Sequence, residues 1–418
     1  MSHYLFALVD GGGTVPPELG AARRLVERGH RVEVLAEDSM RDEVAATGAT
    51  FRPWERGINR PDRTPENDFL RDWECRTPLQ LIKRMLDRVL AGPAPDYAAD
   101  LLAAVEDDRP DAVVCSFFSI GAMVAAEAAG LPYIVLMANV YVLPAREMPP
   151  FGTGATPATG GLSRLRNRAI TALVARQWNK GLDRVNALRK TYGLNPLDDF
   201  WDQVRRADKI LVLTSPAFDF AADLPRNVQY VGPVLDDPQW AADTPWTPPP
   251  GDDPVVLVTM SSTPQDQVGC LQRAIDALSQ LPVRGLVTTG PAVDPKALRP
   301  RENVTVVAMA PHSEVLKHAS VVVTHGGHGT VVRSLAAGVP LVVVPQGRDQ
   351  ADNAVRVESR GAGVTVKSSA SAVTIAAAVK RVLEEPNIGE AARRLGDAIR
   401  ADAASDMLVR ELERKTHS

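Results

Sequence analysis

Short apolar runs alternate with longer amphipathic segments along the first half of the chain. The amphipathic segments 18–28 and 120–129 have the apolar spacing of helices. Continuous runs rich in β-branched residues are typical of strands buried on both faces, and such strands are predicted at 5–9, 31–35, 111–115, 133–137 and 209–214. This alternation predicts an α/β fold in which helices cover both faces of a parallel sheet. Less regular stretches at 51–95 and 141–162 are predicted to be binding loops.

The alternation restarts in the second half, after a segment dense in proline. Residues 234–254 are predicted to be a stiff linker, because a proline-rich segment cannot join a sheet. Further strands are predicted at 255–259, 284–288, 304–307 and 319–324, with helices at 268–281 and 313–317. We therefore expect one domain over residues 1–233, a second over 255–390, and a helical tail over 391–418.

A glycine-rich turn follows the predicted strand 319–324. It contains His325, Gly327, Gly329 and Thr330, and a helical pattern and another short strand come next. This order predicts a βαβ unit whose loop lies beyond the carboxyl end of a strand, where open parallel sheets bind ligands. Glycines let the backbone approach a phosphate, and the helix N-terminus offers free N–H groups to an anion. The alternative is a tight connection without a ligand.

Two polar side chains follow the next predicted strand. Asp349 and Gln350 are adjacent, four and five residues after Pro345. Such a pair suits a ligand rich in hydroxyl groups, and the alternative is a solvated turn and helix cap. For Asp352, slightly further along the chain, the cap is the favoured interpretation.

Composition narrows the classes of function. The chain has 418 residues, is 45% hydrophobic and carries a net charge of −4. These values describe a globular protein of two domains and argue against nucleic acid or an anionic membrane as a partner. The three cysteines lack metal-ligand spacing, and no apolar stretch is long enough to span a membrane. We expect a cytoplasmic protein without a metal site; a homodimer is one alternative for its oligomeric state.

The donor-side motifs resemble the signature of family 1 glycosyltransferases, which use nucleotide-diphosphate sugars. The matching positions keep the family spacing; they are His325, Gly327, Thr330, Gly338, Pro340, Pro345, Asp349 and Gln350. The resemblance implies the GT-B fold, in which two Rossmann-like domains face each other across a cleft and the C-terminal helix crosses back to the first domain. It also implies that His325 and the turn amides of Gly327, Gly329 and Thr330 hold the diphosphate. Asp349 and Gln350 would hold the sugar.

Three further donor contacts are expected. Ser261 and Ser262 end a predicted strand and can bind phosphate, and the alternative is an N-cap for the next helix. The backbone of Ala310 lies in a segment similar to the base-binding segment of the family. Arg333 departs from the pattern, because plant members have a glutamate there that accepts hydrogen bonds from the ribose, and arginine has no acceptor.

The expected catalytic dyad is replaced. Residues 10–17 resemble the family segment that carries a catalytic histidine, but Thr14 stands in its place, and Ser116 stands where an aspartate would orient it. Asp10 is the nearest carboxylate and the candidate substitute base; its alternative role is to accept from the amides of the glycine turn. A dinucleotide-binding fingerprint is disfavoured, since Pro16 occupies the position of its third glycine.

The acceptor is expected to lie between the domains. Phe117, Tyr141 and Phe151 are candidates for an apolar wall, and ordinary core packing is the alternative for each. The resemblance implies an inverting, metal-independent hexosyltransferase. It would move a sugar from a UDP- or dTDP-sugar, as co-substrate, to a hydroxyl of a lipophilic natural product or phenol. The alternatives are a catalytically degenerate auxiliary protein that binds nucleotide sugars and a nucleotide-sugar 2-epimerase.

Overall fold

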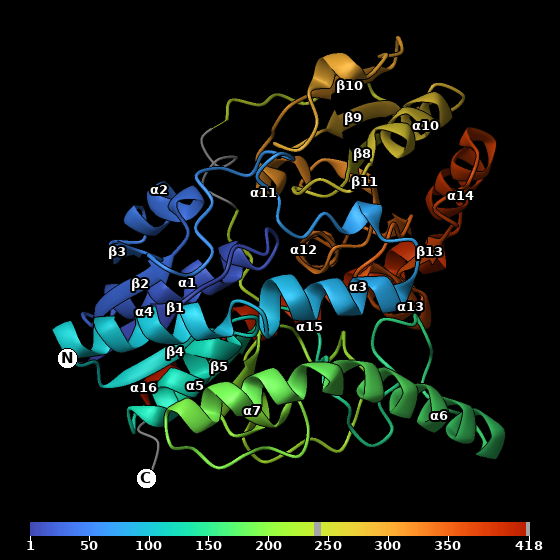
Figure 1. Cartoon of the computed structure of the whole chain (residues 1–418). Coiled ribbons are helices and arrows are strands. Elements are labelled where there is room, and N and C mark those ends of the chain that lie inside the picture. The colour runs from blue at the N-terminus through green and yellow to red at the C-terminus, as the bar shows by residue number, and fades with distance from the viewer. Residues whose placement is uncertain (238–243, 415–418) are drawn as a thin grey trace.

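The computed structural model describes residues 1–237 and 244–414. Part of the predicted linker, 238–243, and the end of the predicted tail, 415–418, lie outside the described residues. The chain forms two parallel sheets, one from each half, and helices pack around both (Figure 1). The expected α/β fold with two sheets is therefore confirmed.

The N-terminal sheet has seven strands in the described residues, in the order β3-β2-β1-β4-β5-β6-β7. Its interior strand β1 pairs in parallel with both β2 and β4. Side chains alternate along β1, so that Leu5 and Ala7 enter one core cluster and Tyr4 and Phe6 enter the cluster on the opposite face. The strands are β1 (His3–Ala7), β2 (Arg31–Ala36), β3 (Thr50–Pro53), β4 (Ala112–Ser116), β5 (Tyr133–Met137), β6 (Lys209–Val212) and β7 (Val228–Tyr230).

The C-terminal sheet has six strands in the described part, in the order β10-β9-β8-β11-β12-β13. Its strands are β8 (Val255–Thr259), β9 (Arg284–Thr288), β10 (Val304–Val307), β11 (Ala319–Thr324), β12 (Leu341–Val343) and β13 (Gly363–Thr365). In both sheets the strand order reverses beside the first strand, between β1 and β4 and between β8 and β11. Open α/β sheets bind ligands at such switch points, beyond the carboxyl ends of the strands.

Helices cover both faces of each sheet (Figure 1). In the first half they are α1 (Val15–Glu27), α2 (Arg41–Ala45), α3 (Pro78–Met85), α4 (Ala94–Asp107), α5 (Ile120–Ala128), α6 (Gly161–Trp178), α7 (Leu182–Thr191) and α8 (Asp202–Arg205). In the second half they are α10 (Val268–Leu278), α11 (His312–Val315), α12 (His328–Ala336), α13 (Gln350–Ser359), α14 (Ala372–Glu384), α15 (Pro386–Ala403) and α16 (Met407–Glu413). The described residues contain no helix with the length and apolar character needed to cross a membrane.

The stretch expected to be irregular contains a helix that the sequence analysis missed. Helix α3 begins at Pro78, and the Thr77 side chain accepts a hydrogen bond from the backbone N–H of Gln80. A threonine N-cap followed by proline at the first helical position is a recognised start signal. Thr77 and Pro78 carry this signal in the sequence, so the start of α3 could have been predicted without the structure.

The last helix packs on the opposite half of the molecule. In α16, Leu408 and Leu412 belong to the same core cluster as Tyr4 and Phe6 of β1. The Tyr4 hydroxyl donates to the Leu412 carbonyl at 3.2 Å. The preceding helix, α15, packs instead against α12 of the C-terminal half. The chain end thus ties the two sheets together.

A buried ion pair joins the two halves directly. Arg356 of α13 donates through Nε to Asp219 Oδ1 at 2.8 Å, and both side chains are at most 2% exposed. The Asp219 carboxylate also accepts from the backbone N–H of Tyr141, and the Arg356 guanidinium lies 4.5 Å from the ring centre of Phe220. Because Asp219 follows β6 and Arg356 follows β12, this pair locks the carboxyl ends of the two sheets together.

We predict that Asp219→Ala destabilises the protein by about 3–5 kcal/mol, because it leaves the Arg356 charge buried without its partner. Denaturant unfolding followed by circular dichroism would measure the loss. The matched control is Asp276→Ala, which removes the partially exposed pair with Arg301 and should change stability by less than about 1 kcal/mol. Equal effects of the two substitutions would contradict the role of the buried pair.

Candidate active site

A cavity of about 730 Å³ lies between the two halves. Its wall includes the loops that follow β1, β4 and β5 in the first sheet and β8, β11 and β12 in the second. Both halves therefore contribute the carboxyl ends of their strands to one site. The two helices α3 and α6 add an apolar side to it.

The loop after β1 touches the loop after β8. Gly12 has a positive φ of 71°, and a Cβ atom there would lie 2.5 Å from Thr263 Cγ2. A side chain at this position would push the two loops apart. The carbonyl oxygen of Gly13 also lies within 4.0 Å of the Cβ position of Gly329 on the other half. The candidate acceptor and donor segments are thus in direct proximity.

The turn after β11 has the geometry expected of an anion site. His325 follows β11, and α12 begins at His328 with Gly327 as its N-cap residue. A Cβ atom on Gly327 would lie 2.5 Å from His325 Nε2, so the imidazole can pack over the turn only because residue 327 is glycine. His325, Gly327, Gly329 and Thr330 all line the cavity. The free N–H groups at the start of α12 are consequently available to an anion.

His325 acts in its neutral form. Burial, and then the positive charge of Arg348, lower the pKa of His325 to about 3. At pH 7 its imidazole carries one N–H donor and no charge. The residue can therefore donate a hydrogen bond to a diphosphate oxygen, but it does not neutralise the charge.

Arg348 brings a positive charge to the same part of the cavity, and the sequence analysis did not single it out. It lies in the loop after β12 with a positive φ of 53°. Its guanidinium binds the carboxylate of Asp72 on the first half and donates to Thr263 Oγ1 at 2.8 Å. Arg348 thus bridges the two sides of the cavity. Its place directly before the Asp-Gln pair was the available signal.

Asp349 and Gln350 both line the cavity, but their hydrogen bonds differ. Asp349 Oδ2 accepts from Asn139 of the first half at 2.9 Å and from Asn353 at 2.8 Å. The Gln350 side chain is engaged in two loops: Oε1 accepts from the backbone N–H of Gln346 in its own loop, and Nε2 donates to Gln265 in the loop after β8. Gln350 can reach a sugar hydroxyl only by exchanging the bond to Gln265.

Ser261, Ser262 and Ala310 also line the cavity. The Ser261 hydroxyl accepts from the backbone N–H of Thr263 at 3.1 Å, so it holds the turn after β8. This contact closes a turn and does not cap the next helix, because the N-cap residue of α10 is Gln267. Ser262, which is more exposed, and the buried Ala310 lie on the same wall as the turn after β11.

Arg333 binds the segment that connects the two halves of the chain. Its guanidinium donates to the carbonyl oxygen of Asp236 at 2.7 Å. Burial lowers its pKa, while Asp237 and Asp236 act in the opposite direction. Where the family glutamate would bind a ribose, this arginine holds the start of the predicted linker against α12. Asp352, expected to be a solvated cap, instead accepts from the backbone N–H of Gly152 in the first half at 2.7 Å.

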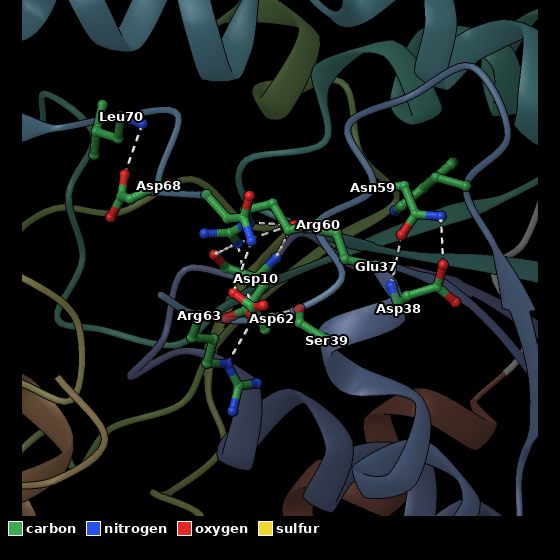
Figure 2. Close-up of polar contacts among 12 residues, drawn as sticks. Asp10, Glu37, Asp38, Ser39, Asn59, Arg60, Asp62, Arg63, Asp68 and Leu70 are labelled. Atoms are coloured by element: carbon green, nitrogen blue, oxygen red, sulfur yellow. Dashed lines mark hydrogen bonds and ion pairs between the residues drawn. The ribbon is translucent and has the colours of Figure 1, made fainter. Parts of the chain in front are cut away.

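Asp10 lies at the centre of a polar network (Figure 2). One carboxylate oxygen accepts from the Gly12 N–H, and the other accepts from the Ser39 hydroxyl and from Arg63 Nε. Burial alone would raise the pKa of Asp10, but the charges of Arg63 and Arg60 outweigh it and hold the pKa below its ordinary value. These contacts match the turn-fixing alternative, and a paired carboxylate of low pKa is a weak base.

Three buried oxygen atoms near Asp10 are without partners. The Thr14 hydroxyl, the Ser116 hydroxyl and Glu18 Oε2 make no hydrogen bond to another described residue. Thr14 and Glu18 line the cavity, whereas Ser116 is fully buried behind it. The sequence analysis assigned no role to Glu18, although its position four residues after Thr14 placed both on one helix face.

The apolar wall is only partly the one that the sequence predicted. Phe117 and Phe151 line the cavity, and Phe117 stacks on Trp201 with ring centres 5.1 Å apart. The expected contact of Tyr141 with the acceptor is wrong, because Tyr141 is 1% exposed and packs in the core behind the wall. Helices α3 and α6 supply much of the remaining surface, including Ile82 and Trp178.

Comparison with known proteins agrees with this geometry. Residues 272–414 match the family model "Erythromycin biosynthesis protein CIII-like, C-terminal domain", and residues 12–192 match "Glycosyl transferase 4-like domain". The 4'-demethylrebeccamycin synthase of Lentzea aerocolonigenes is 33% identical over 97% of this chain and 96% of its own. The chain belongs to the family 1 natural-product glycosyltransferases. It is a glycosyltransferase of the GT-B fold, as its donor motifs predicted.

Solved structures support the same fold. The kitacinnamycin glycotransferase has a TM-score of 0.77 and 26% identity, with 98% of this chain and 97% of that chain covered. A spinosyn rhamnosyltransferase complexed with thymidine diphosphate has a TM-score of 0.69 and 21% identity, with 99% and 100% covered. Both structures superpose over nearly the whole length of this chain and of their own, so the likeness of fold includes both sheets.

We predict that His325→Ala weakens binding of UDP and dTDP and lowers glycosyl transfer on the order of 10²-fold, because one hydrogen-bond donor to the leaving diphosphate is lost. Calorimetry and turnover would measure the two effects. His318→Ala is the matched control, since this exposed histidine lies in the same half but outside the cavity. Unchanged affinity and turnover in His325→Ala would remove the residue from the donor site.

Proposed function

We propose that this glycosyltransferase moves a sugar from a dTDP- or UDP-sugar to a hydroxyl group of a lipophilic small molecule, with inversion and without a metal ion. The observation that carries the proposal is one cavity with two chemically different sides. An anion-binding turn with His325 and the start of α12 lies on one side. Apolar side chains from α3, α6 and the loop after β4 lie on the other.

The donor side suits a diphosphate leaving group. Free N–H groups at the start of α12, the neutral imidazole of His325 and the nearby charge of Arg348 converge on one region. Preorganised donors of this kind stabilise the charge that develops on a leaving group without reorganising. They supply the function that a metal ion has in other phosphate sites. This convergence supports a metal-independent reaction.

The acceptor side suits an aromatic or otherwise lipophilic molecule. Its wall includes Leu81, Ile82, Met85, Val174 and Trp178. Burial of such a surface by an apolar acceptor contributes roughly 25 cal/mol per Å². The name of the rebeccamycin relative also favours a natural product as acceptor, and the relative bound to thymidine diphosphate favours a dTDP-sugar.

The proposed reaction is a single displacement. The acceptor oxygen forms a bond to the anomeric carbon while the bond from that carbon to the β-phosphate oxygen breaks. The nucleotide diphosphate leaves with the bonding electron pair, and the acceptor proton passes to a base. Attack from the face opposite the leaving group inverts the anomeric centre.

We further propose that residues 1–233 form the acceptor domain and residues 255–390 the donor domain. The proposed location is the cytoplasm. For the oligomeric state, we propose a homodimer as one alternative.

One observation favours a second candidate function. Thr14 and Ser116 replace the dyad expected from the family, which is compatible with an auxiliary protein that binds a nucleotide sugar without catalysis. Mass spectrometry of a panel of dTDP- and UDP-sugars with phenolic and alcoholic acceptors decides between the two functions. A product of sugar-transfer mass supports the transferase, and donor binding without product from any pair supports the auxiliary protein.

We predict that Asp349→Ala lowers transfer turnover at least tenfold and leaves the affinity for free dTDP or UDP near that of the parent, because Asp349 is proposed to contact sugar hydroxyls only. Asn139→Ala is the matched control: it removes the same contact between the halves while retaining the carboxylate. Steady-state kinetics and calorimetry would separate the effects. An equal collapse of free nucleotide binding would make Asp349 a structural residue.

A further inference from the structure

We propose that Glu18 is the general base that takes the proton of the acceptor hydroxyl. This role rests on the proposed transferase function and identifies the group that replaces the missing histidine. Glu18 lies in the first turns of α1, lines the cavity and is 1% exposed. Its side chain therefore belongs to the wall that the first half contributes to the cavity and is shielded from bulk water.

Helix geometry explains how Glu18 can take over from residue 14. Thr14 is the N-cap residue of α1, and Glu18 follows it by four residues. Side chains four residues apart lie on the same helix face, about one turn from each other. A carboxyl group on the longer side chain at position 18 can thus serve the space that a histidine at position 14 would occupy. Thr14 leaves that space open because its side chain is small.

Unpaired polar atoms around Glu18 indicate a place where a ligand hydroxyl group can bind. Buried polar atoms are nearly always paired, yet Thr14 Oγ1, Ser116 Oγ and Glu18 Oε2 make no hydrogen bond of normal geometry within the described part of the chain. The Ser116 hydroxyl is nevertheless near enough to Glu18 to act on its pKa. The residues lie on adjacent elements, since Thr14 and Glu18 belong to the start of α1 and Ser116 ends β4 beside β1. An acceptor hydroxyl that donates to Glu18 Oε2 would satisfy a carboxylate that now has a free position.

The surroundings also distinguish Glu18 from Asp10. Asp10 has both oxygens occupied and two arginines close by, whereas Glu18 has a free oxygen and faces the Asp10 charge and the Ser116 hydroxyl. Burial raises the pKa of Glu18 to about 8; the Ser116 hydroxyl opposes this effect and the Asp10 charge adds to it. A general base works best with a pKa near the operating pH. Asp10 instead anchors the turn.

The replacement at position 116 is consistent with the same assignment. In the family pattern an aspartate at this position would orient the histidine. Here an aspartate would place a second carboxylate beside Glu18 in a buried region, and like charges so close resist simultaneous ionisation. Serine provides a hydroxyl without charge. The changes at positions 14 and 116 therefore both accommodate a carboxyl base at position 18.

The proton balance of the step is simple. As the acceptor oxygen bonds to the anomeric carbon, its proton moves to Glu18 in those molecules in which the carboxyl group is ionised, a fraction that grows as the pH rises towards 8 and above. The bond to the diphosphate breaks at the same time, and the electron pair leaves with the nucleotide diphosphate. Glu18 then returns its proton to solvent after the product leaves. No oxidant, reductant or additional reactant is required.

The decisive experiment compares Glu18→Gln with the parent across acceptors of different acidity, using dTDP-glucose and UDP-glucose as donors. Glutamine keeps the size of the side chain and removes its basicity. We expect transfer to alcohols to fall about 10²–10⁴-fold, with a smaller loss for acidic phenols that ionise without help. Glu18→Asp should restore part of the rate with alcohols. Glu27→Gln, on the exposed end of α1, is the matched control and should retain parental rates.

A second measurement needs no substrate. The folded pKa of Glu18 is raised from 4.5 to about 8. Between these pH values the unfolded chain loses the Glu18 proton while the folded protein keeps it, so this residue makes the parent progressively less stable as the pH rises. Glu18→Gln lacks this pH dependence. The difference in thermal midpoint between variant and parent should therefore shift in favour of the variant from pH 5 to pH 8 and be constant above. This result also shows that the variant is folded.

The outcomes separate this role from the proposed function. A parent that transfers sugar, together with a Glu18→Gln variant of equal rate on alcohols and phenols, overturns the base assignment and leaves the transferase intact. The same assignment fails if Asp10→Asn, and not Glu18→Gln, produces the dependence on acceptor acidity. A parent that gives no product with any donor and acceptor pair rejects the transferase function, and the base role with it. A selective loss on alcohols in a folded Glu18→Gln variant supports the proposal.

Discussion

The active site depends on the buried pairing of Arg356 with Asp219 across the two halves. An unpaired charge is strongly destabilising at a buried position, so each residue requires its partner. The pair therefore constrains how the carboxyl ends of the two sheets face each other. Contacts around it follow from that arrangement: Asp352 accepts from Gly152, and Asn139 donates to Asp349. The cavity exists because these contacts hold two independent sheets in one orientation. A change in this orientation would separate the donor turn from the acceptor wall.

Within the cavity, burial determines what each polar group can do. His325 is uncharged because desolvation lowers its pKa, so it contributes a directed hydrogen bond rather than a charge. The positive charge near the diphosphate site comes instead from Arg348, whose guanidinium also binds Asp72 of the first half. The donor side thus combines the N–H groups at a helix N-terminus with an arginine held by Asp72 and Thr263. This arrangement suits the proposed diphosphate leaving group, and the apolar opposite wall suits the proposed lipophilic acceptor.

Departures from the family pattern have local physical reasons. Arg333 holds the carbonyl oxygen of Asp236, so a position that contacts a ribose in plant members here fastens the connection between the halves. The replaced dyad coincides with a buried carboxyl at Glu18, one helical turn further along α1. At Arg333 the departure has a structural role in the chain itself, and at position 14 the proposed replacement is a neighbouring carboxyl group. A motif specifies positions in the chain, but the residues that surround these positions in the folded protein determine the chemical properties of each side chain.

The sequence by itself determined the α/β alternation, the two sheets and the donor turn, because apolar runs, glycine spacing and caps are local properties of the chain. His325 and Gly327 were identifiable for that reason. Only the tertiary structure decided which long-range partners each side chain meets. Asp10 is paired with arginines, Tyr141 lies in the core rather than at the cavity, and Glu18 Oε2 is buried without a hydrogen-bond partner among the described residues. Burial, pairing and pKa depend on residues far away in the chain, so no local pattern contains them.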